Sequence, residues 1–189
     1  MRVHRMMGTK GWVAGMCAVV ALWGGSGESA AQTGGLDHSP AEVVKKYLSL
    51  DQKGARLDAM SVDAVVPYTS WRDEPVWGQV IVTRAFTVSE HYSKWDVVNK
   101  MEVVIPVTFQ ILGSIYLETA GFVPDARSEE VRFRVKSVKN RWRIMEPMLP
   151  PHVGQKRAIN FVREAWIKET EPAKRETLAA LQDELRKVK

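Results

Sequence analysis

The sequence predicts an α+β domain in which helices cover one face of a curved antiparallel sheet. Three observations lead to this prediction. Apolar residues follow helical spacing from residue 40 onward, and they alternate with a period of two between Val65 and Met145. From residue 153 to the end, the helical spacing returns. We therefore expect helices first, then a run of strands, then a helical extension.

Composition limits the classes of protein that need consideration. The 189 residues, 45% of them apolar and 26% charged, are enough for one globular domain. The net charge of +5 arises from 27 basic and 22 acidic residues, a mixed balance that does not indicate a nucleic-acid protein. One cysteine excludes a disulfide framework and a cysteine zinc site, and four scattered histidines argue against a histidine metal cluster. We predict no cofactor and no metal, and assign no catalytic residue.

Residues 1–31 have the pattern of a secretory signal peptide. Three basic residues precede an apolar stretch over residues 12–23, which is too short to span a bilayer as a helix. Small residues at Ser29–Ala31 then offer a cleavage site near Ala31. We expect export to the periplasm or the medium, with an N-terminal membrane anchor as the alternative.

The first helix of the mature chain has a clear start. Residues 32–38 are small and polar and are expected to form a flexible lead-in. Ser39, with Pro40 at the first helical position and Glu42 three residues on, has the spacing of a capping box. The helix is expected to end near Gly54, followed by a second short helix or turn over residues 55–60.

A first hairpin is predicted from two alternating segments, residues 80–92 and 97–109. A four-residue loop, Ser93–Asp96, joins them. With this loop, the apolar faces of both strands fall on the same side of the sheet. The expected cross-strand pairs are Tyr92 with Val97, Glu90 with Asn99, Val88 with Met101, and Phe86 with Val103.

A second hairpin follows, with a two-residue turn at Lys139–Asn140 that places Val135 opposite Ile144. The proline-rich segment at residues 146–151 must then leave the sheet. Two helices meeting at Pro172 are expected beyond it. The last one carries an apolar stripe, which predicts that it is docked on its own sheet or on a second subunit; the stripe comprises Leu178, Leu181, Leu185 and Val188.

Three segments together resemble the NTF2-like superfamily, the cone-shaped fold shared with SnoaL-like cyclases and ketosteroid isomerases. They are the helical start SPAEVVKKYLSL, the strand VVIPVTFQILG, and VRFRVKSVKNRWRI followed by prolines. The resemblance covers residues 39–152 and leaves residues 153–189 as a C-terminal helical extension. It implies N-terminal helices packed on the concave face of the sheet and a conical pocket. This fold hosts enzymes, ligand carriers and interaction modules, so it does not decide the activity.

A candidate ligand site follows from polar residues on the otherwise apolar strand face. Inward charges are costly unless paired, so Arg84, Glu90 and Asn99 are expected to converge in the cone. Tyr68 and Trp77 are added as aromatic lining. The alternatives are a bulge or an open sheet end that exposes the polar residues, and a purely structural role for the tryptophans.

The outward face of the second hairpin is strongly basic. It is predicted to bind an anionic envelope component or an acidic protein, or else to be a solvated face that prevents edge pairing. The residues of this predicted anionic-partner surface are Arg132, Arg134, Lys136, Arg141 and Arg143.

The leading prediction is a non-catalytic, exported binding or interaction module of the bacterial envelope. It would use the conical pocket for a small apolar ligand or the basic hairpin for an anionic partner; nucleic acid is excluded after export. The alternatives are a small isomerase or cyclase acting on an apolar carbonyl compound, and an envelope lipid carrier. A homodimer stays open as an alternative.

Overall fold

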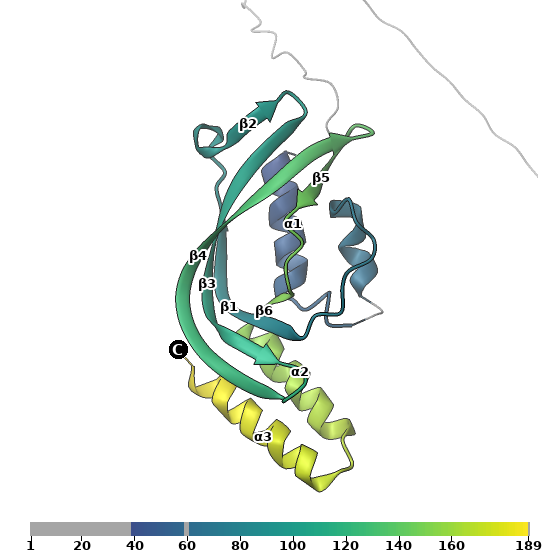
Figure 1. The fold of residues 1–189 in the computed structure, drawn as a ribbon, viewed down its shortest axis with the longest axis vertical. Coiled ribbons are helices and arrows are strands. Elements are labelled where there is room, and N and C mark those ends of the chain that lie inside the picture. Colours follow the sequence, from purple (N-terminus) through teal and green to yellow (C-terminus); the bar gives the residue numbers. More distant parts are fainter. Residues whose placement is uncertain (1–38, 59–60, 189) are drawn as a thin grey trace, which may run out of the picture. The chain divides into compact units, whose positions relative to one another are not determined.

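In the computed structural model, six strands among the described residues, 39–58 and 61–188, form a strongly curled half-barrel (Figure 1). The predicted signal peptide (1–31) and lead-in (32–38) lie outside the described residues. The strands are β1 (Gln79–Val88), β2 (Asp96–Asn99), β3 (Glu102–Tyr116), β4 (Gly121–Val138), β5 (Arg141–Glu146) and β6 (His152–Gly154). The helices are α1 (Pro40–Gln52), α2 (Gln155–Lys168) and α3 (Pro172–Lys187), with single 3-10 turns η1 (Val62–Ala64), η2 (Val66–Tyr68) and η3 (Tyr92–Lys94).

The start and end of α1 confirm the capping prediction. The Ser39 hydroxyl accepts the Glu42 N–H at 3.2 Å, and a Glu42 carboxylate oxygen accepts the Ser39 N–H at 3.4 Å. At the other end, Gly54 adopts a φ of +83°, a left-handed conformation that glycine tolerates best. The chain then forms a turn over the described residues 55–58.

Helix α1 packs against the concave side of the curled sheet (Figure 1). Its buried face meets strand residues that point to the same side of the sheet, so their side chains fill the space between helix and strands. The fully buried side chains of this first core include Val44 and Tyr47 from α1 and Val107, Phe109 and Phe133 from β3 and β4.

The predicted first hairpin is wrong in its register: β1 pairs with the end of the predicted second strand and with the residues beyond it. Strand β1 pairs with β3, so Phe86 lies opposite Phe109 rather than Val103, and Val88 lies opposite Val107 rather than Met101. Strand β2 is a separate short arm that pairs only with β3. The Asn99 side chain accepts the Met101 N–H at 2.9 Å in the turn between them. The period-two spacing of Val97, Met101 and Val103 continues through this turn, which is why the sequence suggested one strand.

The second hairpin confirms its prediction. Val135 lies opposite Ile144, and Lys136 opposite Arg143, across the β4–β5 pair. Lys139 and Asn140 have φ values of +50° and +64°, as the turn type that suits a two-residue hairpin requires. The hairpin is therefore determined by its local turn.

Two features of the sheet were not predicted. Strand β4 begins at Gly121, ahead of the segment that the alternation indicated. Its residues 123–130 pair with β3 while staying largely exposed, so they have no apolar alternation. After the proline-rich segment, the chain re-enters the sheet as β6, which runs parallel to β1. The sheet is therefore mixed rather than purely antiparallel.

The curl of the sheet coincides with β-bulges. Register shifts interrupt the β1–β3 pair on both sides of Thr83 and the β3–β4 pair between Ile111 and Gly113. Gly113 has a φ of +155°, and a Cβ atom there would lie 2.3 Å from the Val123 carbonyl oxygen. Bulges bend strands and increase their twist, so these positions help to close the half-barrel around α1.

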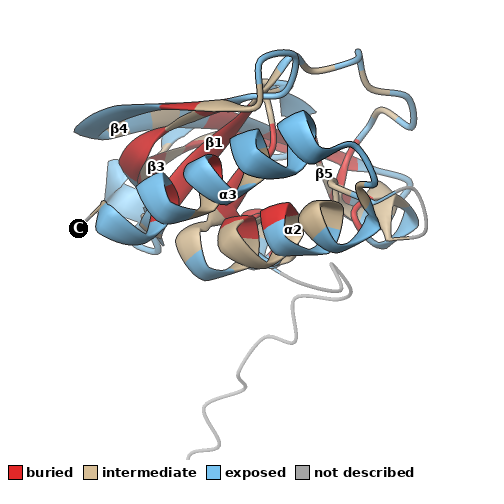
Figure 2. Ribbon diagram, turned by 90° about the horizontal axis from the view of Figure 1, so that it is seen from below, coloured by how far each residue is buried: buried red, intermediate tan, exposed pale blue. Residues whose placement is uncertain are grey.

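Helices α2 and α3 cover a second core at the other end of the sheet (Figures 1 and 2). Val80 and Val82 of β1 contribute to this core, whereas Ile81 between them belongs to the first, because successive strand residues alternate faces. Leu181 and Leu185 of α3 are buried here, with exposed fractions of 3% and 0%. The predicted docking of the last helix is confirmed, and its docking surface lies within this chain.

Candidate functional site

The three polar residues predicted to converge inside the cone do not meet. Arg84 is exposed beside the β1 bulge, Asn99 caps the β2–β3 turn, and Glu90 follows the end of β1 with 65% of its side chain exposed. The predicted Glu90–Asn99 pair depended on the wrong register, so this convergence is wrong. A role for each of these residues in ligand binding stays a prediction.

Two of the predicted ligand residues, Tyr68 and Glu90, do line the same open hollow, of about 920 Å³. This α1 hollow lies between α1, η2 and the connection from β1 to β2. Its volume falls within the range of small-molecule sites. The lining residues are Ser39, Ala41, Glu42, Lys45, Lys46, Ser49, Leu50, Tyr68, Glu90 and Trp95.

An ion pair crosses the α1 hollow and joins its two walls. The Lys45 ammonium donates to a Glu90 carboxylate oxygen at 2.7 Å, although the two residues lie 45 positions apart in the sequence. The hydrogen bond from Lys45 lowers the pKa of the Glu90 carboxyl, and the same bond raises the pKa of Lys45. Both groups therefore stay charged at neutral pH.

The apolar part of the α1 hollow is aromatic. The half-buried Trp95 is held by its indole N–H, which donates to the Ser89 carbonyl oxygen at 2.7 Å. Tyr68 from η2 and Leu50 from α1 line the same hollow, and both are partly buried against the first core. The hollow thus combines an apolar floor with a charged rim.

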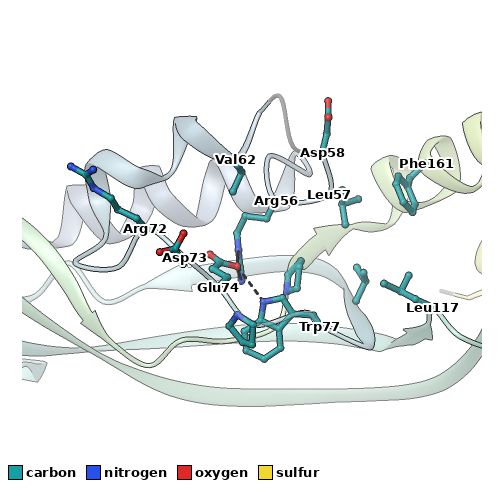
Figure 3. A pocket seen from close by; sticks show the side chains of 13 residues that line it. Arg56, Leu57, Asp58, Val62, Arg72, Asp73, Glu74, Trp77, Leu117 and Phe161 are labelled. Carbon is teal, nitrogen blue, oxygen red and sulfur yellow. Dashed lines mark hydrogen bonds and ion pairs between the residues drawn. The ribbon is translucent and has the colours of Figure 1, made fainter.

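Trp77, the fifth predicted ligand residue, lines a different and smaller hollow of about 430 Å³. Figure 3 shows the residues that line this Trp77 hollow, with Arg56 and Glu74 next to Trp77 and with Leu117 and Phe161 to one side. The Trp77 indole N–H donates to Glu74 Oε2 at 3.2 Å. Trp77 and Tyr68 therefore belong to separate sites.

A buried charge cluster of Asp51, Arg56 and Glu74 adjoins the Trp77 hollow, which Arg56 and Glu74 help to line. Arg56 donates to Glu74 Oε2 through Nε at 2.9 Å and to Asp51 Oδ2 through Nη1 at 3.2 Å. Its Nη2 also donates to the Leu149 carbonyl oxygen at 2.6 Å. The Arg56 side chain is only 1% exposed, so it joins three distant segments as a structural centre.

Two titratable groups beside this cluster have displaced pKa values. Burial raises the pKa of the Asp51 carboxyl to about 6, although Arg56 opposes this shift. Burial also lowers the pKa of the His152 imidazole to about 4. The two residues meet where the backbone N–H of His152 donates to Asp51 Oδ2 at 2.9 Å.

These pKa values predict opposite pH dependences of stability. The folded protein holds the Asp51 proton more tightly than an unfolded chain does, so this contribution to stability falls as the pH rises from about 4 to about 6. The folded protein disfavours protonated His152, so that contribution rises between about pH 4 and pH 6.5. Each amounts to roughly 3 kcal/mol, and together they nearly cancel.

Asp51→Asn should therefore reveal the His152 contribution, with the free energy of unfolding rising steeply from about pH 4 to pH 6.5. His152→Gln should reveal the Asp51 contribution, with the free energy of unfolding falling from about pH 4 to pH 6. Urea denaturation at several pH values measures both slopes. Identical profiles for the two variants would contradict the assignment.

The basic hairpin face divides into two parts. Arg132 forms an ion pair with Asp96, and Arg134 forms ion pairs with Glu102 and Glu146. The Lys136 Nζ atom lies 3.8 Å from Glu102 Oε2. These three cations are therefore largely balanced by carboxylates of β2, β3 and β5, which the sequence pattern of β4 did not indicate. Arg141 and Arg143 lie elsewhere, at a hollow near the β4–β5 turn.

Some residues of these sites were not predicted from the sequence. Lys45 and Leu50 were assigned only to the helix, and Arg56 and Glu74 were assigned no role. The segment WRDEPVW contained one signal of the role of Glu74: Trp71 lies three positions before Glu74, and Trp77 lies three positions after it. Both indoles donate to the Glu74 carboxylate.

No family model, curated protein or solved structure matches this chain, so membership of the NTF2-like superfamily stays a prediction. No helix among the described residues has the length and apolar character to cross a membrane. Over the same part of the chain, no three histidine, cysteine, aspartate or glutamate residues are grouped so that they could hold a metal ion.

Proposed function

We propose that this chain is an exported, non-catalytic binding module of the bacterial envelope, and that it takes a small apolar ligand without net charge in the α1 hollow. The observation that carries the proposal is the aromatic floor beneath a charge-balanced rim. Export follows from the predicted signal peptide.

The charges around the α1 hollow select against strongly charged ligands. Two lysines, Lys45 and Lys46, face two glutamates, Glu42 and Glu90, so the rim carries no net charge. The apolar faces of Tyr68, Trp95 and Leu50 lie below it. Such a lining favours a flat or aliphatic molecule that gains free energy mainly by leaving water.

The filled interior of the half-barrel supports binding at this site. Val44, Tyr47 and Leu48 of α1 are at most 2% exposed and occupy the concave face that a deep conical pocket would need. A ligand would therefore bind beside α1, where the half-buried floor of the α1 hollow meets solvent.

The state of Glu90 favours binding over isomerase-type chemistry. A general acid or base for proton transfer near neutral pH needs a carboxyl whose pKa is raised by burial. Glu90 is exposed, and its ion pair with Lys45 lowers its pKa instead. Asp51, whose carboxyl has a raised pKa, is buried against Arg56 and the backbone N–H of His152 and does not line the α1 hollow.

A neutral apolar fluorophore, N-phenylnaphthylamine, tests the proposal. We expect saturable binding with energy transfer from tryptophan, which a Trp95→Phe variant should reduce. Tyr68→Glu places a charge on the apolar floor and should weaken binding at least about tenfold. The matched control is Tyr116→Glu on β3, where the tyrosine is 43% exposed outside the hollow. Non-saturable binding, or equal weakening by both variants, would contradict the proposal.

Native mass spectrometry of the protein from its own cell envelope complements this test. It measures the mass of any ligand that co-purifies, together with the mass of the chain. A chain shortened by residues 1–31 is the expected result. An apolar ligand retained by the unmutated protein and lost from Tyr68→Glu would identify the bound molecule.

A further inference from the structure

The basic residues of the β4–β5 turn help to form a separate hollow of about 730 Å³. This basic hollow lies between η2 with its following segment and the β4–β5 turn. Four cations line it: Arg72, Lys139, Arg141 and Arg143. One carboxylate, Asp63, lines it as well, so its formal charge is +3. None of these residues lines the α1 hollow.

The walls of the basic hollow are tied together by hydrogen bonds. Arg143 Nη1 donates to the carbonyl oxygens of Val66 and Thr69, at 3.1 and 2.8 Å. The Ser70 N–H donates to the Ile144 carbonyl oxygen at 2.9 Å. Arg143 is therefore held in place, and no acceptor among the described residues contacts its Nε or Nη2.

The cations of the basic hollow lack carboxylate partners, unlike other basic residues of the β4–β5 hairpin. Arg132 and Arg134 form ion pairs with carboxylates. Within the described part of the chain, no such pair involves Arg72, Lys139 or Arg141. In Figure 3 the Arg72 side chain points away from Arg56 and Trp77, so it does not belong to the buried charge cluster. Like charges held close together are unfavourable until an anion joins them.

We propose that the basic hollow binds a phosphoryl group. A charge of +3 suits a dianion better than a single carboxylate, and guanidinium groups match the geometry of phosphate oxygens with paired N–H donors. Val138 and Met145, each 36% exposed, line the same hollow and offer apolar contact to the organic part of a phosphate ester. A lipid headgroup and a soluble phosphate share this chemistry.

Two probes distinguish these sources. Inorganic pyrophosphate, titrated into the protein and followed by calorimetry, reports a soluble phosphoryl ligand. Vesicles of phosphatidic acid, whose headgroup is a phosphomonoester, in phosphatidylcholine, compared with pure phosphatidylcholine in a sedimentation assay, report a lipid headgroup. Binding of pyrophosphate alone indicates a soluble ligand, and binding of the vesicles alone indicates a lipid headgroup. Binding of both indicates a site that recognises only the phosphoryl group.

Charge-matched variants decide whether the basic hollow is the site. Arg141→Gln and Arg72→Gln change exposed side chains and should each weaken binding at least about tenfold. Arg132→Gln removes the same charge from the same hairpin, but from a residue paired with Asp96, and should leave binding within about twofold. Absence of binding to both probes would overturn the proposal. Equal weakening by Arg132→Gln and Arg141→Gln would also overturn it, because binding would then follow overall charge. Either result would leave the α1 hollow proposal untouched.

Discussion

Replacing Arg56 by methionine is expected to lower the free energy of unfolding by about 3–5 kcal/mol, because the substitution leaves two buried carboxylates without their cation. The side chains of Asp51 and Glu74 are only 2% and 14% exposed and both accept hydrogen bonds from Arg56. The Leu149 carbonyl oxygen would lose a donor as well. Urea denaturation at constant pH measures the loss.

The control for this prediction is Arg132→Met. Arg132 pairs with Asp96, but its side chain is 54% exposed, and exposed pairs contribute about 0–1 kcal/mol. Adding Glu74→Gln to Arg56→Met should recover part of the stability, because it removes one of the unpaired charges. A loss for Arg56→Met no larger than that for Arg132→Met would show that the buried charge cluster does not hold the three segments together.

Leu185→Ala is the second substitution with a large expected effect, about 2–5 kcal/mol of unfolding free energy. Leu185 is 0% exposed in the second core, where it packs among side chains of the sheet and of α2. The Gln155 side chain also donates to the carbonyl oxygens of Leu185 and Val188, each at 2.7 Å, and so holds the end of α3. Amide exchange of residues 178–188 should become faster in this variant.

Leu117→Ala is the matched control, since Leu117 is 45% exposed and the change should cost little. In the unmutated protein, exchange of residues 178–188 should be slow at all protein concentrations. Exchange at the rate of an unprotected peptide would contradict the docking of α3. Exchange that accelerates on dilution would instead place the docking surface on a second subunit.

The sequence predicted only some of the residues that form the candidate sites, and the reason is physical. Tyr68 and Glu90 were predicted to bind a ligand and do share the α1 hollow, yet the predicted geometry, with Glu90 beside Asn99, was wrong. Glu90 finds its charge partner on α1, at Lys45. A contact between a helix and a loop 45 residues later leaves no periodic signal in the sequence.

The same reason explains the basic hairpin. Alternation along β4 and β5 placed the basic residues correctly on one side, but it contained no information on the carboxylates of neighbouring strands. Asp96 of β2, Glu102 of β3 and Glu146 of β5 balance three of the cations. Arg141 and Arg143 face a different segment, the one around η2. The chain fold therefore decides which cations remain for an anionic partner.

The sequence by itself determined those elements whose causes are local. The capping box sets the start of α1, positive φ values at Lys139 and Asn140 set the β4–β5 turn, and Pro172 separates α2 from α3. Such features depend on residues within a few positions of one another.

Only the tertiary structure decided the register of β1 on β3, the return of the chain as parallel β6, and the buried cluster around Arg56. Each of these joins segments that lie far apart in the sequence. Val97, Asn99 and Met101 continue the alternation of β3 through a turn, so either pairing satisfied the pattern. The choice between them follows from the packing of β1 and β3 against α1, where Phe109 and Val107 are at most 1% exposed.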